Sequence, residues 1–114
     1  MQFTQRLKGR AVSNLAVVTE ISYLLDFSRK AQLDFWQWVR NGALVLIEPE
    51  AADWDRMLQV LKKYADRPMD FTDATVVALC ERMGTRDIAS VDSDFTVYRY
   101  RNRQPFRNQF FDEV

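Results

Sequence analysis

The sequence contains no histidine, and this absence removes several classes of chemistry. Ser-His-Asp and Cys-His nucleophilic centres need an imidazole, and so does a histidine-ligated zinc site. Cys80 is the single cysteine, so the chain cannot form an internal disulfide. Because Cys80 lies in the apolar segment VVALCERM, we expect it to be a small buried hydrophobic residue.

Glycine and proline are scarce, at three residues each, which argues against disorder, repeats and low complexity. No apolar run approaches the roughly 20 residues that a membrane span needs, and no signal peptide opens the chain. We therefore expect a cytoplasmic protein without a membrane partner. Since 47% of the residues are hydrophobic, we expect one core and a single domain over residues 1–114.

An excess of charge of either sign is also absent, because 16 basic residues balance 16 acidic ones. No global field therefore attracts nucleic acid. Near the end of the chain, however, four arginines lie close together: Arg99, Arg101, Arg103 and Arg107. This arginine cluster has two interpretations, either a basic rim that contacts phosphates or an ordinary solvated loop.

Helix-like and strand-like patterns alternate along the chain. Apolar spacing predicts helices over 15–25, 29–41, 50–65 and 71–83, with Gly42 and Gly84 as stops. Short apolar segments predict strands over 11–15, 43–47, 87–91 and 105–111, the last of them at an edge. The first ten residues are expected to be the tail of a helix that ends at Gly9. This alternation indicates an α/β domain with three layers and a mainly parallel sheet.

Apolar patterns also predict which faces are buried. The run ALVLI over 43–47 is typical of a strand covered on both faces. The helix over 29–41 has an expected buried stripe of Leu33, Phe35, Trp36 and Val39. We favour core packing for these residues over a partner interface, which exposed Phe35 or Trp38 surface would indicate. The helix over 50–65 has an expected buried stripe of Trp54, Met57, Leu58, Leu61 and Tyr64.

Four acidic positions stand out: Glu20, Asp73, Asp92 and Asp94. Buried carboxylates are rare unless they are paired or bind a metal, and hard oxygen ligands suit Mg²⁺ or Mn²⁺. In an open parallel sheet, ligands bind beyond the carboxyl ends of the strands, where Asp92 and Asp94 are expected. A metal held there can activate water and neutralise charge on a phosphodiester.

Each acid also has a purely structural interpretation. Asp70 and Asp73 have the spacing of a capping box and would then only cap a helix. Asp92 and Asp94 would be turn residues at a strand end, and Glu20 would be exposed to solvent. If the acids do converge, their repulsion raises a pKa until a cation binds, so stability should depend on metal.

Three segments resemble the PIN-domain family and, within it, the VapC-type toxins of bacterial toxin–antitoxin pairs. They are AVVTEISYLL, YADRPMDFTDATVVALCERMGTRDIASVDSDFTVYR and the trailing PFR. The second segment is the most specific, with D-x-x-D-A, an apolar helix, a glycine, a strand and S-x-D-x-D-F in this order. The resemblance covers roughly residues 9–107, and it implies an α/β/α sandwich and a metal-dependent ribonuclease.

The resemblance also implies roles for single residues. The implied catalytic and metal-binding residues are Glu20, Asp73 and Asp92, with Asp94 as a further ligand to Mg²⁺ or Mn²⁺. Ser90 and Arg99 would contact the substrate. In the implied mechanism, metal-activated water attacks an RNA phosphodiester without a covalent intermediate. The implied partners are RNA, a cognate antitoxin and a second copy of the chain.

One family feature has no counterpart here, namely an opening strand that carries a further acid, followed by a helix. The first ten residues are too few for both elements, so we expect an N-terminally truncated fold with an open side between strands 11–15 and 87–91. A start codon placed too late, direct closure of these strands, or another subunit would account for the gap. The site then lacks one carboxylate, so we expect weak or absent cleavage. The alternative function is a non-catalytic module that dimerises or binds a protein partner.

Overall fold

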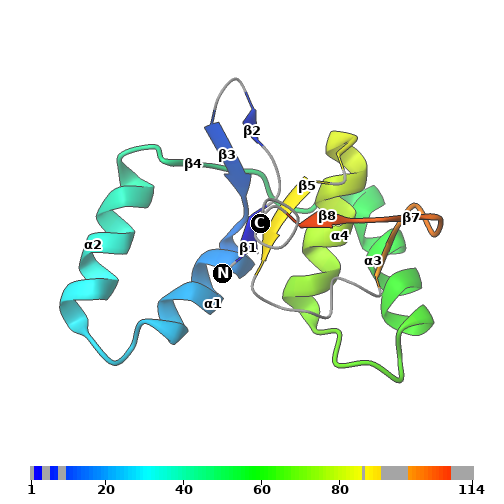
Figure 1. The fold of residues 1–114 in the computed structure, drawn as a ribbon, viewed down its shortest axis with the longest axis horizontal. Coiled ribbons are helices and arrows are strands. Elements are labelled where there is room, and N and C mark those ends of the chain that lie inside the picture. Colours follow the sequence, from blue (N-terminus) through cyan, green and yellow to red (C-terminus); the bar gives the residue numbers. More distant parts are fainter. Residues whose placement is uncertain (1, 4–5, 8–9, 86, 91–97, 109–114) are drawn as a thin grey trace.

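The computed structural model describes residues 2–3, 6–7, 10–85, 87–90 and 98–108, and these form a mixed α/β fold (Figure 1). Its helices are α1 (Leu15–Leu24), α2 (Arg29–Arg40), α3 (Ala51–Lys63) and α4 (Phe71–Met83). Its strands are β1 (Gln2–Phe3), β2 (Arg6–Leu7), β3 (Arg10–Ser13), β4 (Leu44–Leu46), β5 (Asp87–Ser90), β6 (Arg99–Tyr100), β7 (Gln104–Pro105) and β8 (Arg107–Asn108). Figure 1 shows α3 and α4 on one side of the strands, with α1 and α2 on the other.

The helices begin and end close to the predicted residues because local signals fix their ends. Asn14, Ser28 and Asp70 are the N-caps of α1, α2 and α4, and each side chain accepts a backbone N–H three residues further on. Gly84 ends α4 in the left-handed conformation, with a φ of +73° that a residue with a Cβ rarely adopts.

The strands pair in short groups. In one group, β3 lies between β2 and β4 and runs parallel to β4, with Ala11 opposite Leu44. In another, β5 lies between β1 and β8 and runs parallel to β8, with Asp87 opposite Arg107. β6 and β7 form an antiparallel hairpin. The predicted α/β class is therefore confirmed, whereas the three-layer sandwich stays a prediction.

The prediction of a helix tail in the first ten residues is wrong, because β1 and β2 are strands. β1 pairs antiparallel with β5, with Gln2 opposite Ser90 and Phe3 opposite Ala89. It also lies next to β3, so the side of β3 and β5 that was expected to be open contains β1 among the described strands. These short polar segments take their conformation from pairing with distant residues, which local sequence patterns do not show.

The core lies around α4, whose residues 72–80 are all buried and include Cys80, as predicted. Against α4, α3 buries Met57, Val60 and Tyr64, which form one stripe at helical spacing. The predicted α3 stripe is thus partly wrong. Its other members, Trp54, Leu58 and Leu61, are 48%, 53% and 46% exposed.

The prediction that α2 packs into the core is largely wrong, because α2 has no fully buried residue. Leu33, Trp36 and Trp38 are about half exposed, whereas Phe35 is partly buried and packs against the core. Figure 1 shows why, since α2 lies at the periphery, well away from α3 and α4. Likewise, β4 is not covered on both faces, because Leu46 is exposed.

Candidate functional site

Asp73 is the predicted site residue that the structure defines most fully. It lies in the first turn of α4 and is only 3% exposed. Its Oδ2 accepts the backbone N–H of Asp70 at 3.4 Å and the hydroxyl of Tyr98 at 3.3 Å, while the Asp73 N–H donates to Asp70 Oδ1 at 2.9 Å. The capping box predicted for Asp70 and Asp73 is therefore confirmed. The bond from Tyr98 lies outside this helix cap, so the carboxylate has more than a capping role in the packing.

Glu20, the second predicted ligand, lies on α1 next to the buried Ile21 and is itself half-buried. The helices that carry Glu20 and Asp73 pack against each other. Convergence of the two carboxylates stays a prediction.

A second link holds the carboxyl end of β3 close to the start of α4. Asn14 follows β3 directly, and its Nδ2 donates to Thr75 Oγ1 at 3.1 Å. The Oδ1 atom of the same Asn14 side chain accepts the N–H of Val17 at 3.0 Å and thereby caps α1. Next to it, the buried hydroxyl of Ser13 has no hydrogen-bond partner among the described residues. The start of α1, the end of β3 and the first turns of α4 therefore meet at one place.

The remaining predicted ligands cannot be placed beside Asp73. Asp92 and Asp94 lie outside the described residues. The backbone of Ser90 ends β5 and pairs with Gln2, and its side chain also lies outside the described part. The sequence carries the two aspartates between the end of β5 and Tyr98, the residue whose hydroxyl bonds to Asp73.

The arginine cluster is largely engaged within the protein. Arg99, the predicted substrate contact, is half-buried and donates to the carbonyl of the preceding residue at 3.1 Å. Arg101 donates to the carbonyl of Glu81 at 3.2 Å, and Arg107 forms an ion pair with Asp87 at 2.7 Å. These bonds support a structural role for the cluster, and contact with RNA stays a prediction.

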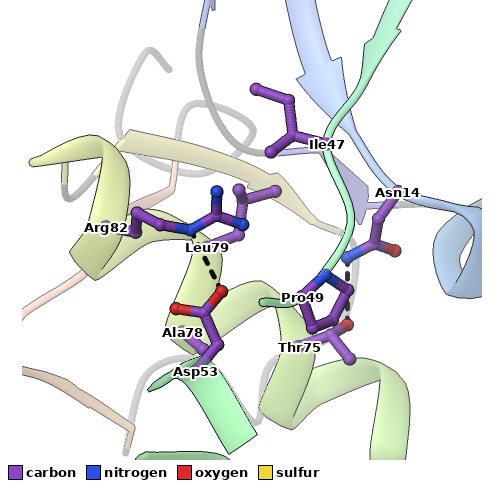
Figure 2. A pocket seen from close by; sticks show the side chains of 8 residues that line it. All are labelled: Asn14, Ile47, Pro49, Asp53, Thr75, Ala78, Leu79 and Arg82. Atoms are coloured by element: carbon purple, nitrogen blue, oxygen red, sulfur yellow. Dashed lines mark hydrogen bonds and ion pairs between the residues drawn. The ribbon is translucent and has the colours of Figure 1, made fainter. Parts of the chain in front are cut away.

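Figure 2 shows a small hollow between the loop after β4 and the helices α3 and α4. Its polar groups bond to one another. Arg82 Nε lies 3.0 Å from Asp53 Oδ2, and Asn14 bonds to Thr75 across the opposite wall. The hollow is too narrow to admit a water molecule. We therefore interpret the hollow as a packed contact whose polar groups bond to one another, and not as a ligand site.

The described residues alone do not make a metal site. Within them, no three Asp, Glu, His or Cys side chains lie close enough together to hold a cation. Asp73 offers a buried carboxylate of the right chemistry, but one carboxylate does not form a Mg²⁺ or Mn²⁺ site. The metal-binding prediction therefore depends on Asp92 and Asp94, which lie outside the described range.

Sequence reasoning missed two contributors to this region, Tyr98 and Asn14. Tyr98 is fully buried, and its ring lies 5.0 Å from that of Tyr64. Its position three residues after the phenylalanine of the S-x-D-x-D-F segment was the available signal, but an aromatic residue there does not by itself indicate a contact with Asp73. Asn14 carried a clearer signal, because it precedes an apolar helical pattern and Asn is a preferred N-cap.

Comparison with known proteins adds no family assignment, since no family model and no curated protein matches the chain. Over the part of the chain that the structure describes, no helix combines the length and apolar character needed to span a bilayer.

Proposed function

We propose that this chain is a PIN-like domain that derives from a metal-dependent ribonuclease of the toxin–antitoxin type. The observation that carries the proposal is the environment of Asp73, a carboxylate that is 3% exposed at the start of a helix. Burial of a carboxylate costs free energy unless partners or a cation compensate it. Asp73 is further held by a buried tyrosine that follows the segment containing Asp92 and Asp94.

In this proposal, Glu20, Asp73 and Asp92 hold Mg²⁺ or Mn²⁺, and Asp94 is a supporting ligand. The bound cation would supply a charge that lowers the pKa of water and stabilises the charge that develops on an RNA phosphodiester. The protein supplies orientation, because the N–H of Asp70 and the hydroxyl of Tyr98 fix the Asp73 carboxylate.

The test is calorimetric titration of Mn²⁺ into the wild-type chain and the Asp73→Asn variant, with Asp70→Asn as the matched control. Both variants lose one negative charge at the start of α4, and both keep side chains that cap a helix. We expect Asp73→Asn to abolish the binding heat while Asp70→Asn retains it. RNA cleavage is then measured with the same three proteins. Unchanged Mn²⁺ affinity in folded Asp73→Asn would exclude this metal site.

A second candidate function is binding of a protein partner without catalysis, and a separate observation favours it. Apolar side chains on α1, on α2 and in the turn between them are uncovered among the described residues, with Tyr23 at 74%, Phe27 at 78% and Trp36 at 47% exposure. Exposed aromatic surface of this kind is typical of interaction sites. A cognate antitoxin is the partner that the family resemblance implies.

This candidate is tested with Trp36→Glu, a change at the exposed edge of α2. If the chain acts through a partner bound there, the variant should lose the partner in co-expression while its Mn²⁺ titration stays unchanged. If the chain acts only as a nuclease, Asp73→Asn should remove activity and Trp36→Glu should not.

A further inference from the structure

Two neighbouring strands, β5 and β8, run in the same direction and therefore lead toward the same edge of the fold. Asp87 of β5 lies opposite Arg107 of β8, and Ile88 lies opposite Asn108. The side chains of the first pair also form an ion pair, in which Arg107 Nε lies 2.7 Å from Asp87 Oδ1. In this parallel register, each position on β8 is level with the position on β5 whose number is lower by 20, as 107 is to 87 and 108 to 88.

Side chains alternate between the two faces of this strand pair. Arg107 and Asp87 face outward, since their side chains are 54% and 40% exposed. Ile88 and Phe106, which directly precedes β8, face the core at 1% and 7% exposure, and they belong to the same buried cluster as residues of α4. On β8, even-numbered positions therefore face the core on the side of α4, and odd-numbered positions face away from it.

The start of α4 lies at the edge toward which β5 and β8 run. Three positions, 84–86, separate Met83 at the end of α4 from Asp87, and both elements bury side chains in one cluster, so β5 runs back along the helix. Asp73 precedes Met83 by ten positions, which is about 15 Å at about 1.5 Å per helical residue. Five strand residues at about 3.3 Å each span about the same distance. A position five residues beyond Asp87 or Arg107 is therefore about level with Asp73.

The sequence places an acid at this position. The residues after Asn108 lie outside the described range, and they read QFFDEV. We propose that Asp112 is a further carboxylate ligand to the cation in the metal site proposed above, on which this inference rests. Asp112 comes five positions after Arg107, so a continuation of β8 in the same register brings it level with Asp73. It comes six positions after Phe106, and an even separation puts it on the face next to α4.

The same register relates Asp112 to the acid that follows β5. Asp92 has the number lower by 20, so the two acids are counterparts on neighbouring parallel strands. Hard cations such as Mg²⁺ and Mn²⁺ bind oxygen ligands, and carboxylates held side by side repel each other until a cation lies between them. Asp112 therefore adds an oxygen ligand from β8 to those that the proposed site takes from α1, α4 and the end of β5.

Glu113, the neighbouring acid, is expected to have no part in the site. It comes an even number of positions, six, after the exposed Arg107, so alternation puts it on the outer face. A slip of the register by one residue would exchange the faces of Asp112 and Glu113. The contrast between these two acids is therefore the specific content of the proposal.

The test is calorimetric titration of Mn²⁺ into wild type, Asp112→Asn and Glu113→Gln, with Asp73→Asn in the same series. Asp112→Asn should weaken Mn²⁺ binding by about tenfold or more, a change of about 1.4 kcal/mol. Glu113→Gln is the matched control, because it removes the same charge from the next residue, and it should leave the affinity unchanged. Asp112→Glu keeps the carboxylate and should retain most of the affinity. The rise in melting temperature that Mn²⁺ causes should be smaller in Asp112→Asn than in Glu113→Gln.

The outcomes separate this inference from the proposed function. If Asp73→Asn abolishes binding and Asp112→Asn does not weaken it, the metal site stands and the role of Asp112 is wrong. Equal losses in Asp112→Asn and Glu113→Gln, or a loss in Glu113→Gln alone, would also overturn the role of Asp112. If the wild type binds no Mn²⁺, or if Asp73→Asn binds it as tightly as the wild type, the proposed metal site fails and the inference fails with it. Circular dichroism verifies that each variant is folded.

Discussion

The ion pair between Arg56 and Glu81 offers the sharpest test of how α3 and α4 hold together. Arg56 Nε lies 2.8 Å from Glu81 Oε1, and Arg56 Nη2 lies 3.0 Å from Glu81 Oε2. The two side chains are only 18% and 12% exposed. Glu81 also accepts the backbone N–H of Arg101 at 2.7 Å, so one carboxylate joins α3, α4 and the turn of the β6–β7 hairpin.

The magnitude follows from this geometry. A hydrogen bond to a charged group contributes about 1.5–3 kcal/mol, and exposed ion pairs contribute about 0–1 kcal/mol. For a bidentate pair with little exposure, we expect a coupling free energy of about 1–2 kcal/mol between Arg56 and Glu81. Glu81→Ala alone should lower the free energy of unfolding by about 3 kcal/mol. It removes the acceptor of the Arg101 N–H and leaves the Arg56 guanidinium with only the neutral acceptors Gln59 and Asn102.

The assay is a double-mutant cycle with Arg56→Ala and Glu81→Ala, in which urea denaturation gives the free energies of unfolding. The matched control is a second cycle on Lys30 and Asp34, which lie 2.7 Å apart on α2 but are 86% and 65% exposed. Their hydrogen bond raises the pKa of Lys30, yet solvent should reduce their coupling to near the limit of measurement. If the coupling free energy of Arg56 and Glu81 does not exceed that of Lys30 and Asp34, the idea that burial strengthens the ion pair is refuted.

Three further predictions concern single residues. Gly84→Ala should lower the free energy of unfolding by about 1 kcal/mol through backbone strain, because φ is +73° and no atom of the described residues beyond its chain neighbours lies within 4 Å of the new Cβ. Gly84→Asn should lower it by less in the same urea titration. Tyr98→Phe should lower it by about 1 kcal/mol through loss of the bond to Asp73, and equal stability of the two proteins would mean that this bond contributes nothing. Burial raises the pKa of the Cys80 thiol, so the unfolded chain loses this proton first as pH rises, and stability should fall above about pH 9 by up to about 1.4 kcal/mol per unit. In Cys80→Ala that part of the slope should vanish.

The elements whose ends are set by neighbouring residues could be predicted well from the sequence. Ser28 and Asp70 indicate where helices begin, and Gly84 indicates where a helix ends, because capping depends on residues within one turn. The pairing of β1 with β5 could not be predicted in this way, since its partners lie at opposite ends of the chain. Short strands of this kind depend on tertiary contacts more than on intrinsic preference.

The direction in which α3 faces the core illustrates a second limit. Trp54–Leu58–Leu61 and Met57–Val60–Tyr64 both have helical spacing, so periodicity alone gives two stripes about 100° apart. The choice between them is made by packing against α4, where Asp53 also forms its ion pair with Arg82. A buried aspartate on the packed side is difficult to infer from sequence, because acids are usually assigned to the solvent face.

In the candidate site, too, local signals could be predicted from the sequence and contacts between distant residues could not. The role of Asp73 in a capping box follows from its three-residue separation from Asp70. The hydroxyl of Tyr98, by contrast, reaches Asp73 from a different part of the chain, and no local rule connects the two.

Asn14 fixes the arrangement of the helix starts around Asp73. The planar amide of Asn14 both caps α1 and bonds to Thr75, so it holds the first turns of α1 and α4 next to each other. Movement of one helix start relative to the other breaks the bond between Asn14 and Thr75. In the metal site proposed above, this bond would hold the helices that carry Glu20 and Asp73 in place before a cation binds. Such pre-organisation lowers the entropy lost on binding.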